Sequence, residues 1–317
     1  MIYREIGDTG VEVSIFGLGG HEYLPNGKSR GFNEDFEKAT TPGYIFDGFG
    51  GEQRKKVLRR AFEHGINFFD VTQDSEKEAL GRNLQELEVP YEIYVQTRPE
   101  GMVYTYDEHN TKMANYELLE QEVHRILDLL RRDRIDFFNF AFMESALRHD
   151  PNYLEKISEN IEKLKDKGLI RFACADTFSG EYTYMRQIEA SCFDVVYINF
   201  NFADYGSKRK VLPTAMKEGM GVITREAFMK GEFFKMAEEA GYTDKTELAQ
   251  LALKWNLSHP EATSVIVGTG NPDHLSKDLE ILDDMELSEK ENRIIREIKS
   301  TETYKQYEDE KLKEFFE

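Results

Sequence analysis

The chain has 317 residues, of which 40% are hydrophobic and 12% aromatic, enough apolar material for the core of a large domain. Its 60 acidic residues outnumber 41 basic ones and give a formal net charge of −19, which repels nucleic-acid phosphates and anionic lipid headgroups. Because the N-terminus lacks an apolar signal region and no apolar run approaches the roughly 18 residues of a membrane span, we expect a cytoplasmic protein with neither nucleic-acid nor membrane partners.

The first predicted element is a β-hairpin over residues 3–14. Two runs of alternating residues flank the segment Gly7-Asp8-Thr9-Gly10, and glycine together with aspartate is typical of a tight hairpin turn. We expect this hairpin to cover the N-terminal mouth of the fold that follows.

Eight short runs rich in Val, Ile and Phe come next, separated by longer segments of helical period. This alternation predicts βαβ units, and eight parallel strands are enough to close a barrel. The sequence therefore predicts an α/β fold, a (β/α)8 TIM barrel, as a single domain over residues 1–317. The predicted strands are Ile15–Gly19, Asn67–Asp70, Ile93–Thr97, Ile135–Phe140, Arg171–Ala175, Val195–Asn199, Gly221–Thr224 and Ser264–Val267. The clearest predicted helices are Glu52–His64, Tyr116–Arg132, Leu154–Lys167 and Thr246–Ser258.

Two segments depart from this regular pattern. Residues 22–50 form an unusually long connection after the first barrel strand, where loops of about 2–6 residues are usual. This connection is either a lid over the active face or an ordered surface excursion. After Leu287 the chain becomes rich in Lys and Glu with interspersed aromatic residues, which predicts a C-terminal helix packed on the barrel; a partner-binding tail is the alternative.

Charged and polar side chains stand where the predicted strands end, and these carboxyl ends form the catalytic face of a TIM barrel. Asp70 and Arg98, on neighbouring strands, are predicted to form an ion pair, and Arg225 is placed to meet Asp176 or Glu226. The alternative is that such ion pairs only fill a polar mouth. The residues delivered to this face are His21, Glu22, Asp70, Arg98, Glu144, Asp176, Asn199, Asn201, Arg225 and Glu226.

His21 follows Gly19-Gly20 at a strand end and is a candidate general acid or base, the alternative being a hydrogen-bonded histidine in the wall of the mouth. His21 and nearby carboxylates suit a divalent cation, but their spacing does not require one, and we predict no metal site. Two cysteines, Cys174 and Cys192, are too few for a cysteine-ligated cluster, and we expect both to be reduced.

Several local motifs occur in a fixed order along nearly the whole chain. They begin with Gly17-Leu-Gly19-Gly20 and Gly65-Ile-Asn-Phe-Phe-Asp70 and end with Val265-Ile-Val-Gly268-Thr269. Together they are specific, although each alone is weak. In these motifs the chain resembles the aldo-keto reductases. The resemblance implies a TIM barrel that binds NADP(H) across its C-terminal face and protonates a carbonyl oxygen while hydride arrives.

The catalytic residues that the resemblance implies are only partly present. Asp70 matches the family's aspartate, but the segment Val71–Glu76 contains no tyrosine to match the family's proton donor. Arg98 stands at the position of the family's lysine, where it keeps the charge but is a poor proton source. Ala141 stands at the position of the histidine. Asp70, Arg98 and His21 are therefore the candidate catalytic residues.

The cofactor contacts implied by the resemblance are also altered. Asp176-Thr177 stands where the family's Ser-Asn pair holds the nicotinamide amide, and Tyr197 replaces a glutamine. The turn Gly268–Asn271 opens a helix and offers backbone N–H groups to a phosphate, as barrels commonly do after their last strands. The candidate cofactor-binding residues are Asp176, Thr177, Tyr197, Arg225, Lys230, Gly268, Thr269, Gly270, Asn271, Lys277 and Asp278.

These features favour an NADP(H)-dependent oxidoreductase of the aldo-keto reductase type, acting on an unidentified carbonyl or alcohol substrate through an altered site. Two alternatives stand beside it. One is a barrel that binds a nucleotide or metabolite without turnover. The other is a non-redox enzyme that uses the charged mouth, because one barrel hosts many chemistries.

Overall fold

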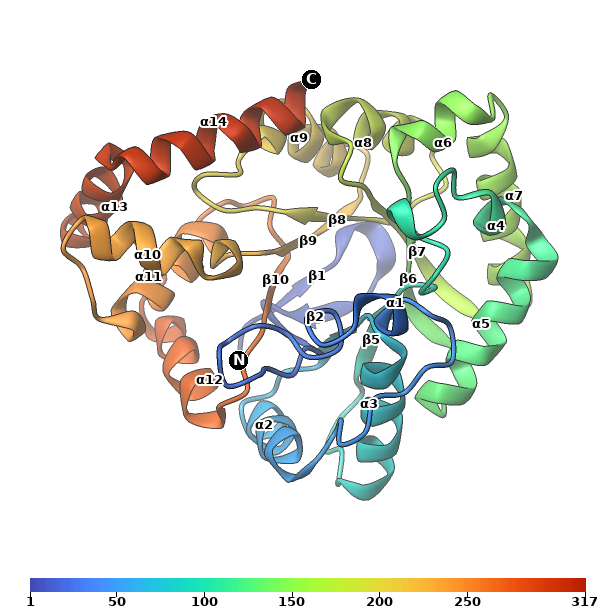
Figure 1. The fold of residues 1–317 in the computed structure, drawn as a ribbon, viewed down its shortest axis with the longest axis horizontal. Helices are drawn as coiled ribbons and strands as arrows, with labels where there is room; N and C mark the ends of the chain where they lie inside the picture. Colours follow the sequence, from blue (N-terminus) through green and yellow to red (C-terminus); the bar gives the residue numbers. More distant parts are fainter.

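The structure, a computed structural model, describes residues 1–317 and contains a closed barrel of eight parallel strands surrounded by helices (Figure 1). Around the barrel the strands run in the order β10-β3-β4-β5-β6-β7-β8-β9, so each strand pairs with its sequence neighbour and the last closes on the first. The predicted fold is confirmed. The barrel strands are β3 (Phe16–Gly19), β4 (Phe68–Val71), β5 (Tyr94–Thr97), β6 (Ile135–Ala141), β7 (Ile170–Asp176), β8 (Val195–Asn199), β9 (Gly221–Arg225) and β10 (Ser264–Val267).

The N-terminal hairpin closes one end of the barrel. Strands β1 (Tyr3–Glu5) and β2 (Glu12–Ser14) pair antiparallel around a 3-10 turn at Gly7–Thr9. Ile6 from this hairpin is fully buried against the apolar side chains that fill the barrel interior. A Cβ on Gly7 would lie 2.3 Å from the backbone nitrogen of Gly221, so only glycine allows the turn to approach this closely.

Helices cover the outside of the barrel, and their boundaries agree with the four predicted helices to within two residues. Their first turns carry side-chain caps at Asn115 and Asp244. The longer helices are α2 (Glu52–Glu63), α3 (Asp74–Glu86), α5 (Tyr116–Leu130), α7 (Tyr153–Asp166), α8 (Gly180–Glu189), α10 (Glu232–Glu239), α11 (Lys245–Leu257) and α12 (Pro272–Leu279). The shorter ones are α1 (Phe36–Ala39), α4 (Thr111–Ala114), α6 (Glu144–His149) and α9 (Val211–Lys217). None of the helices is long and apolar enough to cross a membrane.

The C-terminal segment forms two helices rather than the single one predicted. The chain turns at Thr301 between α13 (Glu289–Ser300) and α14 (Glu302–Phe316), because Thr301 has extended backbone and its hydroxyl caps the second helix at the N–H of Tyr304. The buried Tyr304 hydroxyl donates to the carbonyl oxygen of Phe202 at 2.6 Å. The segment is thus packed on the barrel, and Figure 1 shows α14 running from α13 toward α9 and α8, where the chain ends.

The long connection of residues 22–50 is fastened to the start of α3. The backbone N–H of Gly43 donates to the Asp74 carboxylate at 2.6 Å, and that of Phe46 donates to the Ser75 hydroxyl at 2.9 Å. The Gln73 amide donates to the carbonyl oxygen of Arg30 at 2.9 Å. These bonds favour the ordered excursion over the lid, because a lid must break its contacts with the barrel in order to open.

Candidate active site

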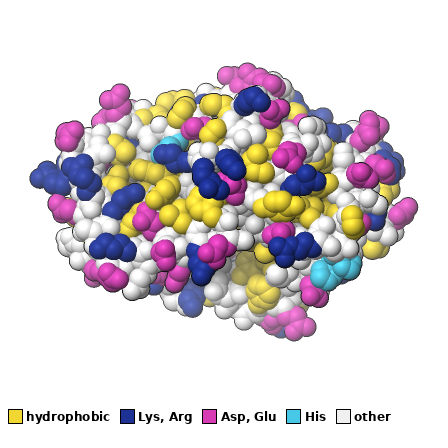
Figure 2. Space-filling view, turned by 90° about the horizontal axis from the view of Figure 1, so that it is seen from above, with side chains coloured by type: hydrophobic (Ala, Val, Ile, Leu, Met, Phe, Trp, Pro, Cys, Tyr) yellow, Lys and Arg dark blue, Asp and Glu magenta, His cyan; other side chains and the backbone are white.

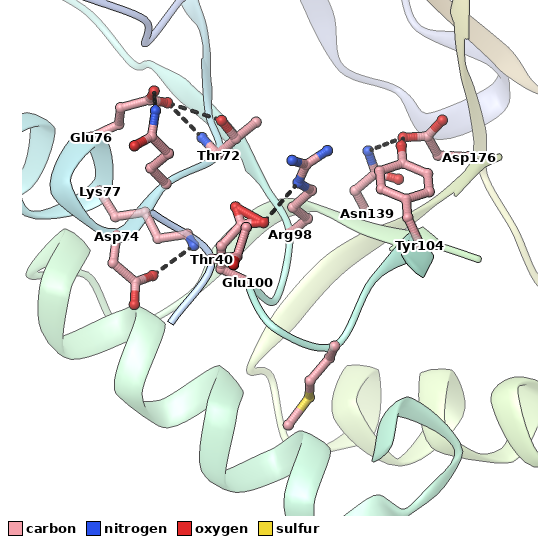
Figure 3. A network of polar contacts seen from close by, with 12 residues as sticks. Thr40, Thr72, Asp74, Glu76, Lys77, Arg98, Glu100, Tyr104, Asn139 and Asp176 are labelled. Atoms are coloured by element: carbon pink, nitrogen blue, oxygen red, sulfur yellow. Dashed lines mark hydrogen bonds and ion pairs between the residues drawn. The ribbon is translucent and has the colours of Figure 1, made fainter. Parts of the chain in front are cut away.

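The carboxyl ends of the barrel strands deliver a layer of polar side chains into the mouth. Alternate residues of a strand point to the same face. Above the buried aromatic residues Phe68 and Phe137, the inward positions are therefore taken by Asp70 on β4 and Asn139 on β6. Part of the layer is drawn in Figure 3, in which Arg98, Asn139 and Asp176 lie along the mouth.

His21 is the most accessible titratable group of this layer, with 39% of its side chain exposed. Its Nδ1 lies 2.6 Å from Oε1 of Glu76, whose side chain is only 1% exposed. A Cβ on Gly20 would lie 2.8 Å from the Glu76 carboxylate, so the glycine before His21 is what admits this contact. The structure thus pairs the predicted candidate His21 with a buried carboxylate on α3.

The interaction between Glu76 and His21 favours the protonated form of the imidazole. Burial alone raises the pKa of Glu76, but the charge and hydrogen bond of His21 and the N–H of Thr72 outweigh it and lower that pKa to about 2. Burial is the largest single influence on His21 and lowers its pKa, but the charge and the hydrogen bond of Glu76 together with the charge of Asp70 outweigh burial, so the net effect is a raised pKa. His21 is therefore an imidazolium over a wider range of pH than a free histidine.

Asp70 does not form the predicted ion pair with Arg98. Its Oδ2 instead accepts a hydrogen bond of 2.7 Å from the hydroxyl of Tyr197, which reaches across the barrel from β8. In the sheet Asp70 pairs with Gln96, and β5 ends at Thr97. Arg98 therefore follows the end of the strand, and its side chain does not contact Asp70. Burial raises the pKa of Asp70 to about 6, the Tyr197 bond acting against it. The sequence indicated no hydroxyl near this aspartate, and the structure corrects that with Tyr197.

Arg98 pairs with Glu100, at 3.4 Å between Nε and Oε1. Both side chains are buried, and the Glu100 carboxylate accepts no hydrogen bond. Burial raises the pKa of Glu100. Burial lowers the pKa of Arg98, but Glu100 together with Tyr104 and Tyr106 outweighs it, so the pKa of Arg98 is raised. Figure 3 shows this carboxylate lying between Arg98 and Lys77. Arg98 thus contributes a fixed positive charge beneath the mouth.

Asp176 forms the centre of a second cluster, as predicted for its pairing with Arg225. The two guanidinium nitrogens of Arg225 lie 2.8 and 2.9 Å from the two carboxylate oxygens. The amide of Asn139 donates to Asp176 at 3.1 Å, and the hydroxyl of Tyr104 donates to the same oxygen. Arg225 also donates from Nε to Asn199 at 2.6 Å. Both carboxylate oxygens of Asp176 therefore accept hydrogen bonds from groups of the protein. We call this set of contacts the Arg225 clasp.

Tyr104 is the main site residue that the sequence did not indicate. It lies in the loop between β5 and α4, with a left-handed backbone (φ 46°), and its ring is buried. The Arg98 guanidinium faces this ring at 5.2 Å and the Phe178 ring lies 4.3 Å from it. The only feature of the sequence that could have indicated Tyr104 is a long loop with two tyrosines directly after a barrel strand. Burial raises the pKa of Tyr104, so its hydroxyl is a weak acid.

The turn before α12 fits the phosphates of a dinucleotide. The turn opens α12, as expected from the sequence, and the Asn271 side chain caps this helix by accepting from the N–H of Asp273 at 2.9 Å. The backbone N–H groups of Thr269 and Gly270 have no partner within the protein, which leaves two donors for an anion at a helix N-terminus. Lys277 is exposed on the same helix and forms no ion pair. These groups together suit a phosphate.

Two other candidate cofactor-binding residues, Lys230 and Asp278, are less well placed to contact a phosphate. Lys230 is 73% exposed and pairs with Glu226 at 3.2 Å, so Glu226 is the partner of Lys230 and not of Arg225. Asp278 is buried, which raises its pKa to about 7 and leaves it without a cation.

The residues that the resemblance matches to the nicotinamide contacts are already engaged with Arg225. Asp176, Thr177 and Tyr197 all line the mouth, but the guanidinium of Arg225 covers the Tyr197 ring at 4.6 Å and saturates Asp176. These side chains therefore leave no free hydrogen-bonding oxygen on Asp176 while Arg225 holds this position. No group of three or more His, Cys, Asp or Glu side chains is arranged to hold a metal ion.

Comparisons with known proteins agree with this architecture. The model of the family described as "Aldo/keto reductase family" matches residues 47–300. An L-galactose dehydrogenase of Arabidopsis thaliana is 24% identical over 89% of this chain and 88% of its own length. An aldo-keto reductase of Bacillus halodurans in its holo form has a TM-score of 0.68 at 17% identity, covering 94% of this chain and 96% of its own. A structure from Pseudomonas aeruginosa assigned to the aldo-keto reductases has a TM-score of 0.61 at 19% identity, covering 90% and 95%.

Proposed function

Because the chain belongs to the aldo/keto reductase family, we propose that it is an NADP(H)-dependent oxidoreductase that interconverts a small carbonyl compound and its alcohol. The observation that carries this proposal is the His21–Glu76 pair, since it is a proton donor at the open mouth of a chain that lacks the family's tyrosine. The name of the Arabidopsis relative, a sugar dehydrogenase, supports a hydroxyl-bearing substrate.

The cofactor, when bound, supplies hydride to the carbonyl carbon or accepts it from the alcohol. Thr269, Gly270 and Lys277 would hold its phosphates. Asp176 and Tyr197 would hold the nicotinamide end after Arg225 leaves. Asp176 accepts hydrogen bonds, which matches the amide NH2 of that ring.

The chain's own residues provide the proton. With Nδ1 of His21 bonded to Glu76, its Nε2–H is the proton that is free to pass to a carbonyl oxygen in reduction. In alcohol oxidation the neutral imidazole takes the proton back. Tyr197 and Tyr104 are poorer donors, because burial raises the pKa of both hydroxyls and both are already donating to carboxylates. Arg98 adds positive charge beneath the developing oxyanion.

The test of the proposal is a titration of the purified protein with NADPH and NADH, followed by intrinsic fluorescence and by thermal stability. Saturable binding followed by reduction of at least one aldehyde or ketone supports it. If neither dinucleotide shifts either signal, the proposal is wrong. Binding without any turnover favours a non-catalytic barrel instead, a function for which the closed Arg225 clasp is the supporting observation.

The rate of carbonyl reduction is expected to fall at alkaline pH. The donor must be the imidazolium, so kcat/KM is constant below the pKa of His21 and falls about tenfold per pH unit above it. Because Glu76 raises that pKa, the Glu76→Gln variant should show the same alkaline limb at lower pH. The measurement is the pH profile of both proteins. Coincident profiles would show that Glu76 does not act on the proton donor.

Opening the clasp is expected to strengthen dinucleotide binding. The Arg225→Met variant no longer saturates Asp176, so the dissociation constant for NADPH should fall roughly tenfold, since a hydrogen bond to a charged group is worth about 1.5–3 kcal/mol. Arg209→Met, which removes an exposed guanidinium paired with Glu181, is the matched control. An unchanged or weaker affinity of Arg225→Met would mean that Arg225 does not obstruct the site.

A further inference from the structure

A cavity of about 330 Å³ lies beside the mouth, between the start of α8 and the end of α14. This is the size of a metabolite pocket, because small-molecule sites occupy about 300–1,000 Å³. Phe178 and Phe315 form apolar walls, and Asn199 and Asp204 are among the polar lining residues. Figure 2, which looks onto the edge of the molecule carrying α14 and α8, shows charged and hydrophobic side chains intermixed over this edge.

Two glycines set the position of this cavity. A Cβ on Gly180 would lie 2.3 Å from the carbonyl oxygen of Phe315, and a Cβ on Gly206 would lie 2.6 Å from the Phe315 ring. The end of α14 therefore rests directly on the backbone of α8 and of the 3-10 turn at Gly206–Arg209. The C-terminal helix is held in place as one wall.

Two polar groups that line the cavity have no partner in the protein. Asp204 is only 8% exposed and its backbone N–H is bonded to Asn201, but its carboxylate has neither a hydrogen bond nor an ion pair. The Asn199 amide accepts from Arg225 through Oδ1, while its Nδ2 donates to nothing. Because no group of the protein donates to this largely buried carboxylate, it is placed to accept hydrogen bonds from whatever occupies the cavity.

The other charges of the lining are already compensated. Lys311 pairs with Glu314 at 2.6 Å, and Lys230 pairs with Glu226. An anionic ligand would be repelled by Glu314 and by the ionised form of Asp204, and a cationic one would meet Lys230 and Lys311. A hydroxyl group can donate to Asp204 and accept from Asn199 Nδ2, which an ammonium group cannot do. Burial, reinforced by Glu226, raises the pKa of Asp204 to about 7, so its carboxyl group can exchange hydrogen bonds in either direction with hydroxyls at neutral pH.

We propose that this cavity binds a neutral, hydroxyl-rich small molecule, a sugar or polyol, through Asp204 and Asn199 and against the rings of Phe178 and Phe315. The C–H faces of such a molecule suit the two aromatic walls. The cavity adjoins the mouth, because Phe178 and Asn199 both contact Arg225. Thr177 and Lys230, two of the candidate cofactor-binding residues, also line the cavity. The proposed contacts are made by Asp204, Asn199 and the two rings, none of which is assigned to the dinucleotide, so the site goes beyond the proposed function.

The experiment titrates the full-length protein, without dinucleotide, with galactose and with sorbitol, by calorimetry and ligand-observed NMR. Galactosamine and galacturonate, of similar size but charged, are the comparison ligands. We expect saturable binding of at least one neutral probe, weaker binding of both charged ones, and an affinity at least tenfold lower in Asp204→Asn. Asp309→Asn, an exposed carboxylate on α14, should bind as the wild type does.

Three outcomes would overturn the site. The first is that neither galactose nor sorbitol binds. The second is that a neutral probe binds Asp204→Asn as tightly as it binds the wild type. The third is that the wild type binds galactosamine or galacturonate more tightly than the neutral probes. Thermal melting of Asp204→Asn confirms that the variant folds, and removal of a buried unpaired carboxylate should not lower its stability. NADPH titration of the same preparations reports separately on the proposed function, so the two can fail independently.

Discussion

The His21→Gln variant is expected to reduce carbonyl substrates about 10²–10⁴-fold more slowly than the wild type, the usual contribution of a general acid. Glutamine keeps a hydrogen-bonding group beside Glu76 but carries no proton that can be transferred. Because His21 lies at the open mouth and not in the phosphate turn, the affinity for NADPH should stay within twofold. The loss should therefore appear in kcat with little change in dinucleotide binding.

The measurement is steady-state kinetics with the best substrate of the carbonyl screen, together with NADPH titration of each variant. His124→Gln is the matched control, since His124 is exposed on α5 and far from the polar layer of the mouth. If His21→Gln retains the wild-type rate, the proton comes from elsewhere. Tyr104 is then the next residue to replace, because its hydroxyl lies at the clasp.

The Asp74→Ala variant is expected to lower the free energy of unfolding by roughly 3–5 kcal/mol, the cost of breaking a buried ion pair from one side. Asp74 is 1% exposed and lies 2.9 Å from Lys77 and 2.5 Å from Arg125. Its removal leaves the fully buried Lys77 ammonium without its ion-pair partner and the N–H of Gly43 without an acceptor. Urea denaturation measures the change.

Two control variants test whether the loss of stability comes from the buried ion pair. Asp47→Ala removes an exposed carboxylate from the same long connection and should change stability by less than about 0.5 kcal/mol. The double variant Asp74→Ala, Lys77→Met removes both charges and should recover part of the loss. A double variant less stable than Asp74→Ala alone would contradict the explanation.

The pH dependence of this contribution has a defined sign. Burial raises the pKa of Asp74, but Lys77 and Arg125 outweigh it and lower that pKa to about 2. A depressed carboxyl pKa stabilises the fold above the pKa of the unfolded chain, about 3.9 for aspartate. The stability difference between wild type and Asp74→Ala should therefore shrink as the pH falls from about 4 toward 2.

The barrel could be predicted because its signal is local. Runs such as Val195–Asn199 and Ser264–Val267 are apolar enough, and short enough, to specify buried parallel strands, and their ends lie where predicted. The pairing of Arg225 with Asp176 also followed from strand order, since both residues end strands on one face. The C-terminal turn at Thr301 was missed, because the helical period continues across it and only the threonine cap marks the break.

The contacts of the candidate site were predictable only in part. The partner of Asp70 depended on how far a Tyr197 side chain reaches across the barrel, and strand order does not encode that distance. Glu76 and Tyr104 lie on a helix start and in a loop, where neither strand nor helix period fixes the direction of a side chain. His21 was identified from its place at a strand end, but not the carboxylate that orients it.

The hydrogen bonds that hold residues 22–50 to α3 should affect which compounds can enter the mouth of the barrel. A connection held at Gly43, Phe46 and Arg30 cannot move outward without breaking these hydrogen bonds, so we expect the opening that it borders to keep a constant width. Molecules are then sorted by their dimensions before any chemistry begins, and compounds too wide for the entrance should be excluded rather than bound slowly. We therefore expect a sharp cutoff in substrate size, with turnover showing no lag from an opening motion of this segment.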